Sequence, residues 1–311
     1  MNNFTSITDV KNPNKLVQQV PSIKNNGVES KVGKHKSLAL IFFNPSLRTR
    51  MSTQKAAQNI GMDVTVMNIN ADAWNIEFED GTIMDGSTQE HIKDAVQVIS
   101  SYCDVMGVRT FANLQNQKED YEEKVLNKFL EYSSVPVISL ESATLHPLQS
   151  LTDLATIAES GIQKPKVVLS WAPHPKKLPQ AVANSFLEWI VQTDAKIKLT
   201  HPKGYELSDQ FTGGVPITHN QKEAFKDADF IYAKNWSSYS NYGQTPQIEK
   251  NWTITSEKMN LTNNGKFMHC LPIRRNVVAT DQVIDQSLVY KQAKNREYAA
   301  QAVLKNILED L

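Results

Sequence analysis

The sequence contains few cysteines and no excess of charge of either sign. Two of its 311 residues are cysteine, Cys103 and Cys270, which excludes a framework of several disulfides and predicts a reducing, cytoplasmic location. Lys and Arg together number 33, as do Asp and Glu, so the formal net charge is zero. Because proteins that bind the phosphates of nucleic acids usually carry a basic excess, we expect no nucleic-acid partner.

Long apolar runs, glycine-rich nucleotide loops and metal-binding patterns are also missing from the sequence. The first residues, MNNFTSITDVKNPNKLV, lack the apolar core of a secretory signal. No run approaches the roughly 20 apolar residues needed to span a bilayer, so we expect no membrane partner. Neither G-x-G-x-x-G nor G-x-x-x-x-G-K-[ST] occurs. The histidines show no metal-ligand spacing such as H-x-x-x-H, and we expect neither a metal nor a cofactor.

Apolar, β-rich runs alternate with amphipathic stretches, which predicts an α/β fold with two doubly wound parallel-sheet domains. LALIFF at 38–43 is typical of a strand buried on both faces, and a helix is predicted from 46 to 60, before Gly61. Further strands are predicted at 64–67, 104–108, 136–139, 166–170, 197–200, 230–233 and 267–270. Further helices are predicted at 90–101, 120–132, 147–160, 181–192, 221–226 and 295–308.

The length predicts about two domains. We place a first domain at residues 1–144, a second at 145–292, and a C-terminal helix at 293–311 that packs back on the first domain. Two stretches lack a regular pattern, WAPHPKKLPQ at 171–180 and the segment 235–257. Long irregular segments in a compact α/β protein are usually functional or covering loops.

The segment SLRTR, Ser46–Arg50, predicts an anion site, because it follows a buried strand and opens a helix. A helix start offers free backbone N–H groups and the positive end of the helix dipole. Arg48 and Arg50 add guanidinium groups that match phosphate oxygens. With no glycine-rich loop beside it, this site suits a small phosphate better than a nucleotide. The alternative is a capping Ser46 followed by solvated arginines.

Two further motifs carry polar groups where strands end. HPLQ, at 146–149, begins a predicted helix, and its His146 and Gln149 can both donate to a carbonyl oxygen, although a single histidine is more often structural. HCLP, at 269–272, ends an apolar strand. Cys270 is either a nucleophile or, more commonly for a lone cysteine, a small buried residue. The backbone carbonyls of this turn are also able to accept from an amide.

SLRTR, HPLQ and HCLP, in this order, resemble the motifs of the transcarbamylases, which transfer the carbamoyl group of carbamoyl phosphate to an amine. The resemblance covers essentially the whole chain and implies a homotrimer with shared sites and a knotted second domain. It implies that Arg109, His146 and Thr49 act in catalysis. The carbamoyl phosphate contacts that it implies are Ser46, Leu47, Arg48, Thr49, Trp74 from a neighbouring subunit, Arg109, His146, Gln149, Cys270, Leu271 and Arg296.

The sequence differs from the ornithine enzymes in the region that binds the second substrate, and this difference indicates which amine is carbamoylated. Their S-M-G loop is missing, and KNW stands at 234–236 instead. An acyl group on the α-nitrogen would remove its charge and leave a carboxylate partner buried without a cation. KNW, WAPHP and LPIRRN resemble the N-acylornithine transcarbamylases, which implies that Glu141, His174, Lys234 and Arg274 contact an acylornithine.

Gln89, in DGSTQEH, resembles the residue that discriminates between acyl groups. Acetyl-type enzymes have Glu there and succinyl-type enzymes have Pro, so Gln89 matches neither; it is otherwise a solvated loop residue. A neutral side chain would not repel a succinyl carboxylate. We therefore expect N-succinylornithine to be carbamoylated to N-succinylcitrulline in arginine biosynthesis.

The alternatives are N-acetylornithine and, less favoured, ornithine as the substrate. A nicotinamide-dependent dehydrogenase would need a glycine fingerprint where SLRTR stands. A non-catalytic relative would be expected to lack Arg48, His146 or Gln149, and all three are present.

Overall fold

The computed structural model describes residues 1–29, 31–245, 247 and 249–311, and the chain forms two compact units. Unit 1 contains Met1–Leu148 and Arg296–Leu311, and unit 2 contains Gln149–Asn295. The divisions fall inside two helices, α7 (Pro147–Ala158) and α13 (Val289–Leu308). Both lie a few residues beyond the boundaries placed at 144 and 292. No helix in the described ranges is long and apolar enough to cross a membrane.

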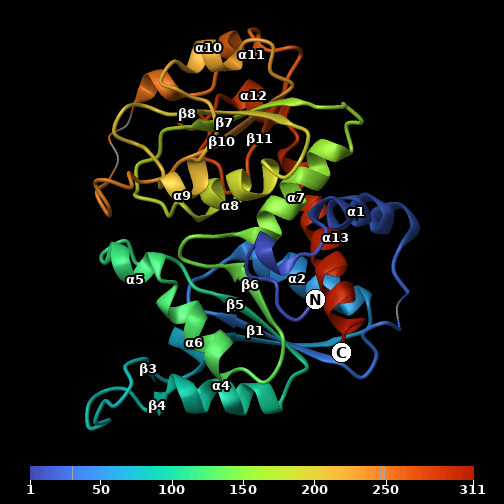
Figure 1. Ribbon diagram of the computed structural model, residues 1–311, viewed down its shortest axis with the longest axis vertical. Helices are drawn as coiled ribbons and strands as arrows, with labels where there is room; N and C mark the ends of the chain where they lie inside the picture. Colours follow the sequence, from blue (N-terminus) through green and yellow to red (C-terminus); the bar gives the residue numbers. More distant parts are fainter. Residues whose placement is uncertain (30, 246, 248) are drawn as a thin grey trace. The chain divides into compact units, whose positions relative to one another are not determined.

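Unit 1 is built on a four-stranded parallel sheet in the order β2-β1-β5-β6. Its strands are β1 (Ser37–Phe42), β2 (Asp63–Asn68), β5 (Val105–Arg109) and β6 (Val137–Glu141). The predicted central strand is β1, whose last five residues are buried. The longer helices of this unit before α7 are α1 (Pro13–Asn26), α2 (Leu47–Asn59), α4 (Ile92–Ser101) and α6 (Lys124–Tyr132). Side chains of α4 and α6 join one face of the sheet in a buried cluster, and α2 lies on the other face (Figure 1).

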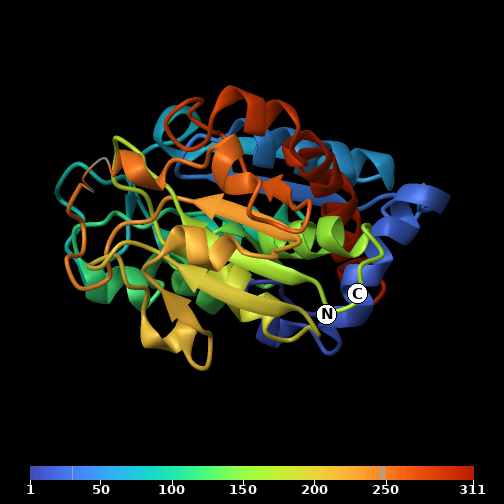
Figure 2. The same cartoon turned by 90° about the horizontal axis from the view of Figure 1, so that it is seen from above.

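Unit 2 is built on a five-stranded parallel sheet in the order β11-β10-β7-β8-β9. Its strands are β7 (Lys166–Trp171), β8 (Lys196–Thr200), β9 (Ile217–Thr218), β10 (Phe230–Lys234) and β11 (Lys266–Met268). The arrows of β7, β8 and β10 point the same way (Figure 2). Its helices include α8 (Ala181–Ile190), α9 (Asp209–Thr212), α10 (Gln221–Phe225), α11 (Ser256–Met259) and α12 (Asp281–Asp285). The expectation of two doubly wound parallel sheets is confirmed.

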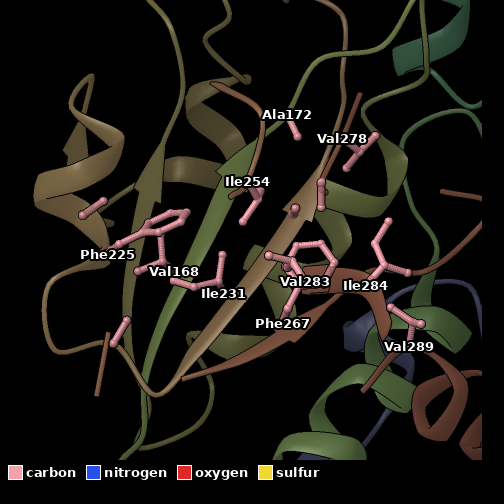
Figure 3. Packing of buried hydrophobic residues seen from close by; sticks show 14 residues of the cluster. Val168, Ala172, Phe225, Ile231, Ile254, Phe267, Val278, Val283, Ile284 and Val289 are labelled. Atoms are coloured by element: carbon pink, nitrogen blue, oxygen red, sulfur yellow. The ribbon is translucent and has the colours of Figure 1, made fainter. Parts of the chain in front are cut away.

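One face of the unit 2 sheet is covered by an apolar cluster. Val168 of β7 and Ile231 of β10 pack there with Val283 and Ile284 of α12 (Figure 3). Burying side chains of this size contributes roughly 1.5–3 kcal/mol each. The cluster therefore ties the α12 segment, which follows the HCLP turn in the chain, to the centre of the sheet.

Each of the two large sheets has one point where the strand order reverses. In unit 1 the chain runs from β1 to β2 and then crosses to β5, so the reversal lies between β1 and β5. In unit 2 it lies between β7 and β10. Open α/β sheets bind ligands at the carboxyl ends of strands beside such reversals. The topology thus singles out the segments that follow β1, β5, β7 and β10.

Several predicted elements were wrong in their bounds. The single helix expected at 120–132 is two helices, α5 (Gln117–Tyr121) and α6, because Glu123 lies between them with a φ of 51°. No glycine or proline marks this break. The helix expected from 90 begins at Ile92, since Glu90 and His91 form β4, which pairs with β3 (Ile76–Glu77). The helix α1 was not predicted, although Pro13 at its first position and the capping Asn12 are ordinary start signals.

The two irregular segments of unit 2 lie against each other. The Asn235 side chain donates to the Ala172 carbonyl at 2.7 Å, and Gln180 Nε2 donates to the Ser237 carbonyl at 2.7 Å. Backbone polar groups of buried loops need such partners. Pro246 and Ile248, within the second segment, lie outside the described residues. The knot expected for this unit stays a prediction.

Candidate active site

The SLRTR motif forms the start of α2, directly after β1. Ser46 is the N-cap, and its hydroxyl accepts from the Thr49 backbone N–H at 3.3 Å. The cap leaves the other first-turn N–H groups of α2 without partners inside the helix. Along this turn Thr49 is buried, Arg48 is half-buried and Leu47 is 68% exposed. The motif thus provides a capped helix start, as expected from the sequence.

A buried polar cluster adjoins this turn, and it contains five of the predicted site residues. Arg109 Nη1 donates to Thr49 Oγ1 at 3.3 Å and to Glu141 Oε2 at 2.7 Å. Arg296 Nη2 donates to Thr49 Oγ1 at 3.1 Å, and Arg296 Nη1 lies 3.2 Å from His146 Nε2. All five residues are at most 8% exposed. Two guanidinium groups therefore converge on one threonine hydroxyl.

His146 lies between a guanidinium and the carboxylate of this cluster. Its Nε2 is 3.2 Å from Arg296 Nη1 and 3.4 Å from Glu141 Oε2. Two guanidinium groups facing one carboxylate give the cluster a net positive charge.

The topology explains how Arg109 and Glu141 meet. They end the neighbouring strands β5 and β6, and the register shifts between Val108 and Arg109 so that Arg109 pairs with Glu141. The guanidinium of Arg109 also lies 4.3 Å above the ring of Phe111. Glu141, one of the predicted acylornithine contacts, lies in unit 1 beside Arg109 and His146.

Glu123 shapes the turn that carries His146, and the sequence did not indicate it. Its carboxylate accepts from the Ser142 and Thr144 hydroxyls at 2.6 and 2.5 Å, and from the Ala143 and Thr144 backbone N–H groups at 3.1 and 2.7 Å. Burial raises the pKa of Glu123, and these hydrogen bonds act in the opposite direction. The left-handed backbone at Glu123 lets its carboxylate reach this turn. The position is a glutamate, and this residue type does not indicate a left-handed backbone in the sequence.

Unit 2 contains a cationic group at its strand-order reversal. Lys234 ends β10, and His174 follows β7 by three residues. The half-buried His174 accepts at Nε2 from Arg274 Nε, at 3.2 Å. Burial lowers the pKa of His174, and the charges of Lys234 and Arg274 lower it further. His174 is therefore held as a neutral acceptor between two cations.

The HPLQ and HCLP motifs also place residues in unit 2. Gln149 is buried in α7, and its Nε2 donates to Asp153 Oδ1 at 2.6 Å. β11 ends at Met268, so Cys270 and Leu271 lie in the turn after the strand rather than in a strand extending to 270. Leu271 has a φ of 57°, and its N–H donates to His269 Nδ1 at 2.9 Å.

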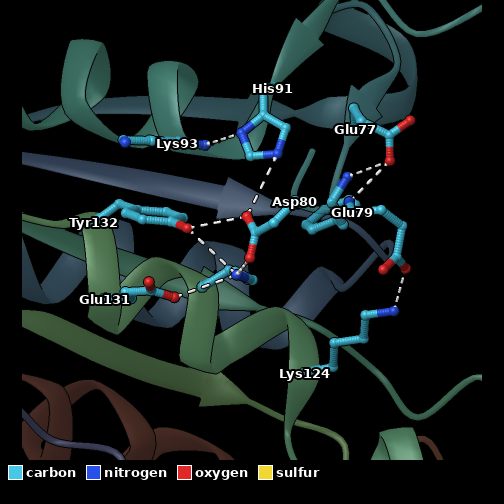
Figure 4. A network of polar contacts seen from close by, with 10 residues as sticks. Glu77, Glu79, Asp80, His91, Lys93, Lys124, Glu131 and Tyr132 are labelled. Atoms are coloured by element: carbon cyan, nitrogen blue, oxygen red, sulfur yellow. Dashed lines mark hydrogen bonds and ion pairs between the residues drawn. The ribbon is translucent and has the colours of Figure 1, made fainter. Parts of the chain in front are cut away.

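Trp74 and Gln89 lie on one exposed segment, which contains β3 and β4. The Trp74 ring is 55% exposed and donates to Glu90 at 2.7 Å, and Gln89 Oε1 accepts from the Asn75 N–H at 3.2 Å. Ion pairs hold this segment to α6. Lys128 binds Asp80 at 2.6 Å, and Lys124 binds Glu79 (Figure 4). The segment is thus anchored at its base while Trp74 and Gln89 face solvent.

The chain matches two family models. The model described as Aspartate/ornithine carbamoyltransferase, carbamoyl-P binding domain, matches residues 2–159. The model described as Aspartate/ornithine carbamoyltransferase, Asp/Orn binding domain, matches residues 179–307. Within the described ranges, no group of three or more His, Cys, Asp or Glu side chains is arranged to hold a metal ion.

Full-length relatives agree with these matches. The chain is 49% identical to N-succinylornithine carbamoyltransferase of Bacteroides fragilis over 100% of both chains. It is 37% identical to N-acetylornithine carbamoyltransferase of Xanthomonas campestris pv. campestris, over 93% of this chain and 92% of the relative. A crystal structure of an N-acetyl-L-ornithine transcarbamylase variant, in which one glutamate is replaced by alanine, superposes with a TM-score of 0.91. It shares 35% identity over 99% of this chain and 100% of that one, and it contains carbamyl phosphate and N-succinyl-L-norvaline.

Removing the charge of Glu141 is expected to destabilise the protein strongly. The variant Glu141→Gln leaves the buried guanidinium of Arg109 without its carboxylate, which should lower the free energy of unfolding by about 3–5 kcal/mol in urea titrations. The exposed pair Arg275–Asp285, at 2.7 Å, is the control, and Asp285→Asn should have a much smaller effect. Equal losses in the two variants would contradict this account of the cluster.

The lowered pKa of His174 predicts a pH dependence of stability. In the unfolded chain, His174 takes up a proton as the pH falls through about 6.5. In the folded protein the pKa of His174 is lower, so its imidazole stays neutral at that pH. Protonation therefore favours the unfolded chain, and the free energy of unfolding decreases as the pH falls below about 6.5. His174→Gln should therefore lose less stability between pH 7 and pH 5 than the wild type. The buried His201 is present in both proteins and cancels in the comparison. Parallel stability curves from urea titrations at several pH values would refute the prediction.

Proposed function

Because this chain belongs to the aspartate/ornithine carbamoyltransferase family, we propose that it transfers the carbamoyl group of carbamoyl phosphate to the side-chain amine of N-succinylornithine. The products are N-succinylcitrulline and phosphate, and the reaction serves arginine biosynthesis in the cytoplasm. The observation that carries this proposal is the full-length likeness to N-succinylornithine carbamoyltransferase, which exceeds that to the N-acetylornithine enzymes. No cofactor is required, because carbamoyl phosphate is already an activated acyl donor.

The proposed phosphate site is the start of α2. The first-turn N–H groups, the Ser46 and Thr49 hydroxyls and the Arg48 guanidinium are the donors available to a dianion there. The buried net positive charge of the adjoining cluster adds attraction that solvent screens little. The same groups stabilise the phosphate as it leaves.

Thr49, Arg109 and His146 are the proposed catalytic residues. Thr49 Oγ1 accepts from two guanidinium groups, which occupy both of its lone pairs, so its own proton is directed elsewhere. A hydroxyl polarised in this way is a strong donor to the carbamoyl oxygen, on which charge builds in the tetrahedral intermediate. Arg109 and Arg296 hold Thr49 in place before the reaction, so no reorganisation is needed as the charge forms.

The carbamoylated amine must lose a proton. The nitrogen of N-succinylornithine forms a bond to the carbamoyl carbon, the bond from that carbon to the phosphate oxygen breaks, and the departing phosphate is the proposed acceptor of the proton. In the cluster of unit 1, the Glu141 carboxylate is already bound to Arg109. Gln149, Cys270 and Leu271 are the proposed contacts for the carbamoyl nitrogen.

N-succinylornithine has two carboxylates and no charged α-amine. His174, Lys234 and Arg274 of unit 2 are its proposed contacts, and two of them are cations suited to carboxylates. Glu141 is a further proposed contact, although its carboxylate already binds Arg109. Gln89 is proposed to select the acyl group. Its neutral side chain tolerates the distal succinyl carboxylate, and N-acetylornithine is the alternative substrate.

A homotrimer with shared sites completes this proposal. Trp74 and Gln89 are exposed on the same anchored segment, as expected of side chains that serve a neighbouring subunit. Trp74 is then a contact for carbamoyl phosphate and Gln89 a contact for the acyl group. Both contributions place substrate recognition at a subunit boundary.

Arg48→Ala tests the phosphate site. Losing one charge-assisted contact of about 1.5–3 kcal/mol should lower kcat/KM for carbamoyl phosphate roughly 10- to 100-fold in initial-rate assays. Lys55→Ala is the control, because Lys55 is an exposed cation two turns along the same helix. Unchanged turnover in Arg48→Ala would show that the start of α2 does not hold the phosphate.

Initial rates with N-succinylornithine, N-acetylornithine and ornithine test the substrate. We expect N-succinylornithine to be preferred, and Gln89→Glu to lower the succinyl-to-acetyl ratio about tenfold or more, because it places like charges together. Gln89→Pro should keep the succinyl preference. A preference for ornithine in the wild type would refute the proposed substrate, and an unchanged ratio in Gln89→Glu would refute the role of Gln89.

A further inference from the structure

One buried carboxylate in unit 2 joins the two groups proposed to bind the carbamoyl nitrogen. Asp153 lies one turn after Gln149 on α7 and is fully buried. Its Oδ1 accepts from Gln149 Nε2 at 2.6 Å and from Gln292 Nε2, on α13, also at 2.6 Å. Two glutamine amides therefore donate to a single carboxyl oxygen.

The second branch leads to the HCLP turn. Gln292 Oε1 accepts from the His269 backbone N–H at 3.1 Å. His269 Nδ1 accepts from the Leu271 N–H at 2.9 Å. Leu271 has left-handed backbone, with a φ of 57°, which a leucine adopts only when its surroundings hold it. The chain Asp153–Gln292–His269 provides such support for the backbone of the turn.

The chemistry of a carboxylate decides the orientation of both amides. The amide nitrogens of Gln149 and Gln292 face Asp153, because both donate to its Oδ1, which accepts. Their oxygens then face the other way. The Gln292 oxygen, Oε1, accepts from the His269 backbone N–H. The Gln149 oxygen points away from Asp153, because the nitrogen of the same amide faces Asp153. An asparagine in place of Asp153 weakens this constraint, because its neutral oxygen is a poorer acceptor than a carboxylate oxygen and its amide nitrogen can turn toward the glutamines instead.

The surroundings of Asp153 strengthen the constraint. The Tyr232 hydroxyl is buried beside Asp153 and Cys270, and burial raises its pKa well above the usual range, with Asp153 raising it further. In such a buried setting, a misdirected amide has no water to satisfy it and is costly. The orientation of Gln149 therefore depends on Asp153.

We propose that Asp153 is a positioning residue that makes this protein select an acyl phosphate bearing an amine. It directs the Gln149 oxygen and, through Gln292, the carbonyls of Cys270 and Leu271 as acceptors for the carbamoyl N–H groups. An acyl phosphate with a methyl group in that place would leave both acceptors unpaired, and sites built in this way reject such analogues. This inference rests on the proposed function.

Two stable analogues test the proposal on the full-length protein. Phosphonoacetamide has the amine, and acetonylphosphonate has a methyl group in its place. Isothermal titration should show that the wild type prefers the amide, and that Asp153→Asn lowers this preference about tenfold or more. The affinity for inorganic phosphate should stay within twofold, because its proposed donors lie in unit 1. A general structural defect would weaken all three ligands alike.

Thr156→Val is the matched control. Thr156 also lies on α7 and accepts from Asn295 of α13 at 3.0 Å, so the substitution breaks a contact between the same two helices without touching the HCLP turn. It should leave the amide preference unchanged. A loss equal to that in Asp153→Asn would show that the preference depends on general helix packing, and would overturn the role of Asp153.

Gln292→Leu keeps the proposal testable if Asp153→Asn does not fold. It removes only the branch to His269, and we expect a smaller loss of the amide preference with Gln149 still oriented. An unchanged preference in either folded variant refutes the inference while the proposed function stands. If the wild type itself binds neither carbamoyl phosphate nor phosphonoacetamide, the proposed function fails first.

Discussion

The buried convergence of Arg109 and Arg296 on the Thr49 hydroxyl is the interaction on which the site in unit 1 depends. Burying two guanidinium groups costs several kcal/mol each unless carboxylates and hydrogen bonds compensate them. Here the Glu141 carboxylate, the His146 imidazole and the Thr49 hydroxyl contact the two guanidinium groups and compensate part of this cost. The remaining positive charge makes the cluster suited to an anion. A protein with a formal charge of zero thus concentrates cations where a dianionic substrate is proposed to bind.

The fold brings these groups together from distant parts of the chain. Thr49 follows β1, Arg109 ends β5, and Arg296 belongs to the helix that returns to unit 1 after the whole of unit 2. The strand-order reversal between β1 and β5 leaves the ends of those strands open to a ligand. Unit 2 repeats the principle, since His174 follows β7 and Lys234 ends β10 at its own reversal. Both halves therefore use sheet topology, rather than a local motif, to assemble polar groups.

Carboxylates have a second task in both units, which is to hold the turns that carry other groups. Glu123 binds the turn before His146 with four hydrogen bonds, and Asp153 orients Gln149 and Gln292. Neither acid had a recognisable signal in the sequence. Asp153 follows Gln149 by one helical turn, but only the packing of α13 and the HCLP turn gives that spacing a meaning. Glu123 lies where periodicity predicts an uninterrupted helix.

The sequence by itself determined the alternation of strands and helices, the strand β1, the capped start of α2 and the motifs that point to the carbamoyltransferase family. These features are local, because burial periodicity and a capping serine act within a few residues. Only the tertiary structure decided that Glu141 pairs with Arg109, that the helix at 120–132 breaks at Glu123, and that Asp153 joins two motifs. These outcomes depend on contacts between residues far apart in the chain, where the free energy of satisfying buried charges and amides outweighs local preference.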